Sequence, residues 1–93
     1  MKKAYKYQFR EGIDVRDVED TLLLACVAAE GLFGEARVRL DTCHCVHRDI
    51  RAVGVDASTD VGLVVNAIFT AFILKEFGRD GFTVQALAME ACQ

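Results

Sequence analysis

Apolar and polar residues alternate in several short segments of the chain, and this period of two predicts strands with one buried face. Tyr5, Tyr7 and Phe9 alternate with polar residues in the first segment. The same alternation covers residues 36–41 and residues 82–87. Together with residues 50–56, where Gly54 suggests a bulge, these segments predict four strands.

Two longer segments predict helices. The first begins after Asp14, a good N-cap, and runs to about residue 30, with Gly31 or Gly34 ending it. The apolar surface of this helix is broader than usual, because Leu23, Leu24 and Val27 extend it beyond the buried stripe. The second helix covers residues 60–77, follows N-cap candidates at 57–60 and ends at Gly78.

The predicted elements follow the order βαββαβ, with residues 43–48 compatible with either a strand or a loop. Right-handed crossovers fold this order into a four-stranded antiparallel sheet with two helices on one face. This two-layer α+β sandwich resembles the ferredoxin-like arrangement, which carries no function by itself. Because no linker or repeat is visible, residues 1–93 are expected to form a single domain.

Composition excludes several classes of protein. The chain is 53% hydrophobic with a net charge of −3, which argues against disorder and against bulk binding to phosphate backbones. Its longest apolar stretch, residues 61–74, is shorter than the ~20 residues that cross a bilayer, so no membrane association is expected. The N-terminus lacks the apolar run of a signal peptide, which predicts a cytoplasmic protein whose cysteines stay reduced.

Residues 61–74 are apolar on nearly all sides, although a helix on a sheet needs only one apolar stripe. We expect one side to cover the sheet, comprising Val61, Val65, Ile68 and Phe72. The other side is then left to contact the first helix or a second copy of the chain, and comprises Leu63, Ala67, Thr70 and Leu74. This excess apolar surface predicts a homo-oligomer.

A dense group of metal-ligating residues contains Cys43, His44, Cys45 and His47. Thiolate and imidazole are natural ligands of zinc, so a metal site is one alternative. However, the backbone of a strand from 43 to 47 spans about 13 Å, too far for one tetrahedral ion. No second pair of ligands completes the set, so no cofactor is expected, with zinc as the ion to test.

The same segment offers a thiol alternative, in which His44 or His47 activates Cys43 or Cys45. Neighbours on a strand point to opposite faces, and no acyl-transfer or redox motif surrounds these residues. The sequence therefore favours a protein that is not an enzyme.

Basic residues cluster on or beside the first predicted strands, and four of them are expected to line the open face of the sheet: Lys6, Arg10, Arg37 and Arg39. RNA binding is the corresponding alternative. The aromatic run of RNA-recognition modules is absent, so nucleic acid is not favoured. The sequence favours a non-catalytic binding or assembly domain that forms homo-oligomers.

Overall fold

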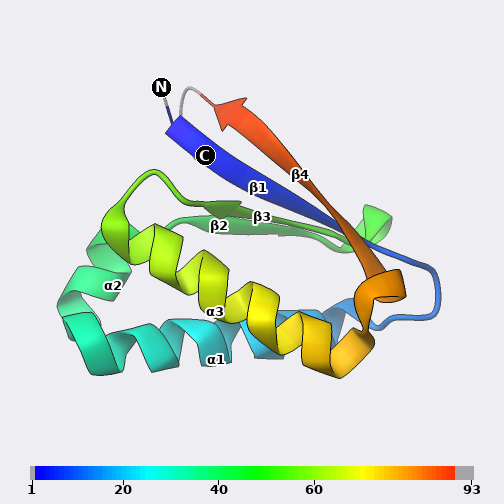
Figure 1. Cartoon of the computed structure of the whole chain (residues 1–93), viewed down its shortest axis with the longest axis horizontal. Coiled ribbons are helices and arrows are strands. Elements are labelled where there is room, and N and C mark those ends of the chain that lie inside the picture. Colours follow the sequence, from blue (N-terminus) through cyan, green and yellow to red (C-terminus); the bar gives the residue numbers. More distant parts are fainter. Residues whose placement is uncertain (1, 90–93) are drawn as a thin grey trace.

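The computed structural model describes residues 2–89, which form a four-stranded antiparallel sheet with three helices (Figure 1). The strands are β1 (Lys2–Phe9), β2 (His44–His47), β3 (Ala52–Asp56) and β4 (Phe82–Met89), in the order β2-β3-β1-β4. The helices are α1 (Val15–Phe33), α2 (Glu35–Asp41) and α3 (Asp60–Phe77). The predicted α+β class is therefore confirmed. The third helix was not predicted.

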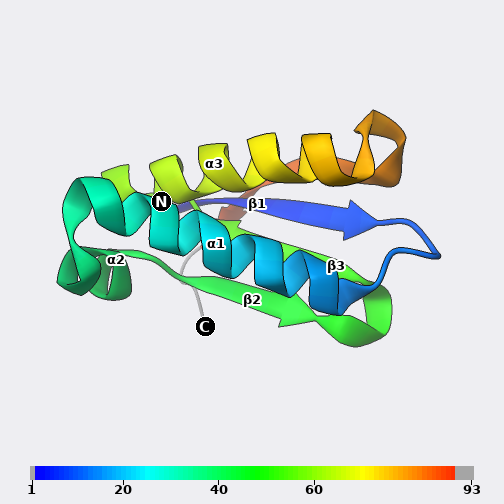
Figure 2. The ribbon, with the colours of Figure 1, turned by 90° about the horizontal axis from the view of Figure 1, so that it is seen from below.

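The long helices form one layer over one face of the sheet, with α1 on the β2 side and α3 on the β1 side (Figures 1 and 2). The core lies between these layers. Its sheet side comprises Tyr7, Phe9, Val53 and Val55. Its helix side comprises Val18, Leu22, Ala25 and Ala29 from α1 and Val61, Val65, Phe69 and Ile73 from α3. None of the helices among residues 2–89 has the length and apolar character needed to cross a bilayer.

Both long helices begin at side-chain caps and end at glycines. The carboxylate of Asp14 accepts a hydrogen bond from the backbone of Arg16, as the predicted N-cap requires. Thr59 caps α3 in the same way, by accepting from the backbone N–H of Gly62. α1 continues to Phe33, and Gly34 at φ 85° ends it, so the predicted end near residue 30 is three residues early.

The predicted strand at residues 36–41 is wrong, because this segment forms α2. Pairs four residues apart stabilise the helix: Arg37 with Asp41 at 3.5 Å and Arg39 with Glu35 at 3.6 Å. Only Val38 of its apolar residues is buried, whereas Leu40 is 83% exposed. A strand here would have needed one face buried throughout.

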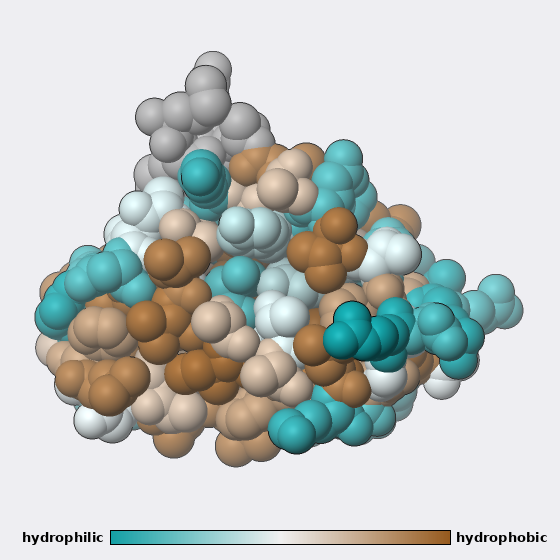
Figure 3. Space-filling view, in the orientation of Figure 1, coloured by the Kyte–Doolittle hydropathy of each residue, from teal (hydrophilic) through white to brown (hydrophobic). Residues whose placement is uncertain are grey.

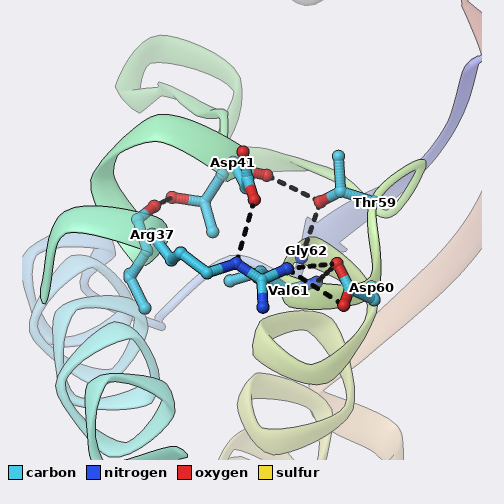
Figure 4. Close-up of polar contacts among 8 residues, drawn as sticks. Arg37, Asp41, Thr59, Asp60, Val61 and Gly62 are labelled. Carbon is cyan, nitrogen blue, oxygen red and sulfur yellow. Dashed lines mark hydrogen bonds and ion pairs between the residues drawn. The ribbon is translucent and has the colours of Figure 1, made fainter. Parts of the chain in front are cut away.

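A polar junction fixes α2 against the start of α3 (Figure 4). The guanidinium of Arg37 donates to both carboxylate oxygens of Asp60, at 3.0 and 3.1 Å. The hydroxyl of Thr59 donates to the backbone carbonyl of Asp41 at 2.6 Å. The hydrogen bond to Asp60 raises the pKa of Arg37, and the same contact with Arg37 lowers the pKa of Asp60.

Residues 43–48, which the sequence left undecided, include the strand β2. β3 begins at Ala52 because residues 48–50 form a 3-10 turn that ends at Arg51 in the left-handed conformation. The predicted bulge at Gly54 is also wrong, since Gly54 pairs in continuous register with Lys6 and Cys45. A Cβ at Gly54 would lie 3.1 Å from the sulfur of Cys45, so the glycine leaves room for that side chain.

The predicted phase of the second helix is partly wrong. Val61 and Val65 cover the sheet as expected, but Phe69 and Ile73 continue the buried stripe in place of Ile68 and Phe72. A helix that is apolar on all sides gives no sequence signal for its rotation about its own axis.

Candidate interaction surface

The outer face of α1 carries large apolar side chains that the fold does not cover. Leu23, Leu24 and Val27 are each more than half exposed, and Leu32 is 72% exposed. These positions lie off the stripe that α1 buries against the sheet and α3. We call these four residues the α1 face. Its signal in the sequence was that apolar residues of this helix extend beyond the buried stripe.

A wide cleft of about 680 Å³ lies beside the α1 face, between α1, α2 and the start of β2. Its lining is mainly apolar and comprises Leu23, Cys26, Val27, Val38 and Thr42, with Glu30, Arg39, Cys43 and His44 completing it. This volume lies in the range of known ligand pockets, although the cleft is open to solvent.

Cys26 and His44, two titratable side chains that line the cleft, favour their neutral forms. Burial raises the pKa of the Cys26 thiol, and the charge of Glu30 raises it further. Partial burial lowers the pKa of His44, against a smaller opposing effect from Glu19. A neutral thiol is a poor nucleophile, so this cleft suits apolar contact better than thiolate chemistry.

The structure does not bring the predicted metal ligands to one point. Pairing places His44 opposite Val55, on the helix side, whereas Cys45 and His47 pair with Gly54 and Ala52 on the open face. Within residues 2–89 no group of three or more Cys, His, Asp or Glu side chains is arranged to hold a metal ion. A zinc site at this segment therefore stays a prediction without a complete ligand set.

Two cysteines of the described chain, Cys26 and Cys45, are free thiols. Cys43 is disulfide-bonded, so the expectation that every cysteine stays reduced is wrong for this residue. A sulfur in a disulfide is neither a thiolate ligand nor a nucleophile until it is reduced. The thiol alternative is thereby confined to Cys45.

The predicted basic sheet face is only partly present. Lys6 lies on the open face, because its neighbours along β1 point to the core, and the exposed Arg10 follows β1. Arg37 and Arg39 do not lie on the sheet at all, because both belong to α2 and form ion pairs there. The basic surface that motivated the RNA alternative is therefore smaller than expected.

Of the predicted contact residues on α3, Leu63 and Ala67 are exposed and Leu74 is half-buried. Thr70 instead points to the sheet, where its hydroxyl lies 2.6 Å from the phenolic oxygen of Tyr7. We call Leu63, Ala67 and Leu74 the α3 flank. It lies on the side of α3 away from α1, because Glu76 and Phe72 face α1.

No protein-family model, curated protein or solved structure matches the chain. The interaction surfaces are therefore defined by their geometry and chemistry alone.

Proposed function

We propose that this protein is a non-catalytic binding and assembly domain that forms homo-oligomers through apolar helix surfaces. The observation that carries the proposal is the exposure of large apolar side chains on the solvent side of both long helices, including Leu24 at 60% and Leu63 at 53%. Contiguous apolar surface of this kind marks interaction sites in soluble proteins.

The energy available is sufficient for a specific contact. Complete burial of a leucine or valine contributes about 1.5–3 kcal/mol, and these side chains have roughly half of that still to gain. Several such residues on each copy would offset a large part of the cost of association, which is at least about 4 kcal/mol.

The fold proposed for this function is ferredoxin-like. Support comes from the two layers, the antiparallel sheet and the central position of β1 between β3 and β4. α2 would then be an addition between α1 and β2, held to α3 by Arg37.

Self-association is tested by static light scattering of the purified protein from about 1 µM to 1 mM. We expect an apparent mass that rises with concentration from 10.3 kDa towards at least twice that value. The double variant Leu24→Lys/Leu63→Lys, which charges both helices, should stay monomeric. Leu40→Lys is the matched control, since it charges an exposed leucine of α2. A wild-type protein that is monomeric at 1 mM contradicts the proposal.

A further inference from the structure

β4 is an edge strand without the features that usually protect such edges. In the sheet that residues 2–89 form, it is the last strand and pairs only with β1, over eight residues in continuous register. Residues 82–89 include no charge and no proline. The opposite edge, β2, is only four residues long and is followed at once by a turn. Long, flat, uncharged edges are templates for pairing with another strand.

The backbone groups that β4 presents outward can be identified from the ladder. The backbone N–H of Arg10 donates to the carbonyl of Gly81 at 3.0 Å, which makes Arg10 and Gly81 opposite each other at a hydrogen-bonding position of the ladder. Because hydrogen-bonded and non-hydrogen-bonded pairs alternate, Thr83, Gln85 and Leu87 face β1 with their N–H groups. The N–H and C=O groups of Phe82, Val84 and Ala86 therefore point away from the sheet.

The inner side chains of β4 also lack a complete cover. Val84 pairs with Tyr7, so both side chains lie on the helix face of the sheet. Tyr7 is 1% exposed, whereas Val84 is 46% exposed. Ala86, which follows Val84 on the same face, is exposed as well. The helix layer thus ends before it covers β4.

The α3 flank borders this uncovered strip. α3 is the long helix on the β4 side of the molecule, with α1 behind it in Figure 1 and below it in Figure 2. In Figure 3, drawn from the same side as Figure 1, apolar side chains form a broad brown area along the course of α3. The strand edge and the apolar flank therefore belong to one side of the molecule.

We propose that β4 pairs antiparallel with β4 of a second copy, so that the two sheets become one continuous sheet. This inference rests on the proposed self-association and names the surface that carries it. A two-fold axis perpendicular to the sheet leaves both helix layers on the same face and brings the two α3 flanks together. It also covers Val84 with the partner's side chains, and the strands bring no like charges together because they have none.

The contact is large enough for a specific dimer. Eight residues at about 3.3 Å each give an edge of roughly 26 Å, and a sheet layer plus a helix is about 20 Å thick. This side therefore measures about 500 Å² per copy, or about 1,000 Å² in total, which reaches the lower limit of specific interfaces.

Amide hydrogen exchange tests the pairing without any mutation. At a concentration where light scattering shows the dimer, the amides of Val84 and Ala86 should exchange at least about tenfold more slowly than in dilute, monomeric protein. The amide of Gln85 is the internal reference, since it bonds to β1 in both states. Equal exchange of Val84 and Ala86 in monomer and dimer would overturn the inference.

Variants separate this contact from the α1 face. Ala86→Pro removes an outward N–H that β1 does not use, and Val84→Lys places a charge on the inner face near the two-fold axis. Each should raise the dimer dissociation constant at least about tenfold. Leu40→Lys is the matched control, since it charges an exposed leucine of α2 outside both surfaces, and should leave the constant within about twofold. Circular dichroism and the Gln85 amide report whether each variant is folded.

The possible failures are distinct. Loss of the dimer in Leu24→Lys, with Ala86→Pro and Val84→Lys unaffected, would overturn the β4 pairing and leave self-association standing. A wild-type protein that is monomeric at 1 mM would overturn both proposals. The edge of β4 would then be available to a strand of another protein.

Discussion

The phenolic oxygen of Tyr7 donates a 2.5 Å hydrogen bond to Oδ1 of Asn66, which joins the middle of the sheet to the middle of α3. The same oxygen lies 2.6 Å from the hydroxyl of Thr70, one turn further along the helix. Thr70 in turn donates to the backbone carbonyl of Asn66 at 2.8 Å. The side chains of Asn66 and Thr70 therefore find hydrogen-bond partners inside the molecule, Asn66 in Tyr7 and Thr70 in the backbone of its own helix.

Tyr7→Phe should destabilise the fold by about 1–2 kcal/mol, because it leaves the side-chain carbonyl of Asn66 without its donor in a partly buried position. The measurement is urea unfolding followed by circular dichroism. Tyr5→Phe, which removes a hydroxyl from the next inward position of the same strand, is the control. If the free energy of unfolding decreases equally in the two variants, the hydrogen bond from Tyr7 to Asn66 does not stabilise the fold.

Gly62→Ala should destabilise the protein by about 1–3 kcal/mol. A Cβ at this position would overlap the backbone carbonyl of Asp56 and lie 3.0 Å from the hydroxyl of Thr59. Backbone atoms cannot rotate away as a flexible side chain can. Thermal unfolding checks the result.

Gly31→Ala is the matched control for this substitution. No atom lies within 4 Å of a Cβ built there, and alanine favours helices over glycine by about 0.5–1 kcal/mol, so this variant should be more stable than wild type. A loss of stability at Gly31 equal to that at Gly62 would contradict the steric explanation.

His44 should make the fold less stable in mild acid. Partial burial lowers its pKa in the folded state, so the unfolded chain takes up a proton first as the pH falls. The free energy of unfolding is therefore unaffected by His44 above pH ~6.5 and decreases as the pH falls from there through the folded-state pKa. The decrease should be modest, because the ring is still partly exposed to water.

Urea unfolding at pH 7.5 and 5.5 measures this effect. His44→Gln should lose less stability than wild type between the two values. His47→Gln removes the same ring from the opposite face of β2 and is the matched control. If His44→Gln loses as much stability as wild type between pH 7.5 and 5.5, protonation of His44 is not the cause of the loss.

Alkylation of Cys26 at pH 8 should be several-fold slower than that of a free cysteine, because burial raises its pKa and only the thiolate reacts. The experiment uses Cys45→Ser, which removes the other free thiol of residues 2–89. Adding Glu30→Gln should increase the rate, since Glu30 also raises that pKa. Alkylation as fast as that of free cysteine would reopen the question of thiol chemistry in the cleft.

The sequence was informative where side chains repeat with a single period. Tyr5, Tyr7 and Phe9 indicated β1, and the caps Asp14 and Gly78 marked the start of α1 and the end of α3. Residues 36–41 were misleading, because so short a segment with alternating apolar positions fits a strand or less than two turns of helix. The pairs Glu35–Arg39 and Arg37–Asp41 were the available signal for the helix.

The candidate surfaces were harder to predict, because they depend on how the layers are placed. The apolar residues of α1 off its buried stripe were visible in the sequence, but not the exposure of Val84 on an inner face. Arg37 carried the charge expected of a sheet face, yet Asp60, 23 residues later, determines where it lies. Such long-range pairs leave no periodic trace along the chain.

The position of β1 between β3 and β4 has a consequence for the order of folding. Lys2 pairs with Met89 and Phe9 with Phe82, so one side of the central strand finds its partner only after nearly the whole described chain has been made. Helix α1 and the β2–β3 hairpin close short loops and can form early. The last strand must close the longest loop, which makes its docking the natural candidate for the slow step of folding.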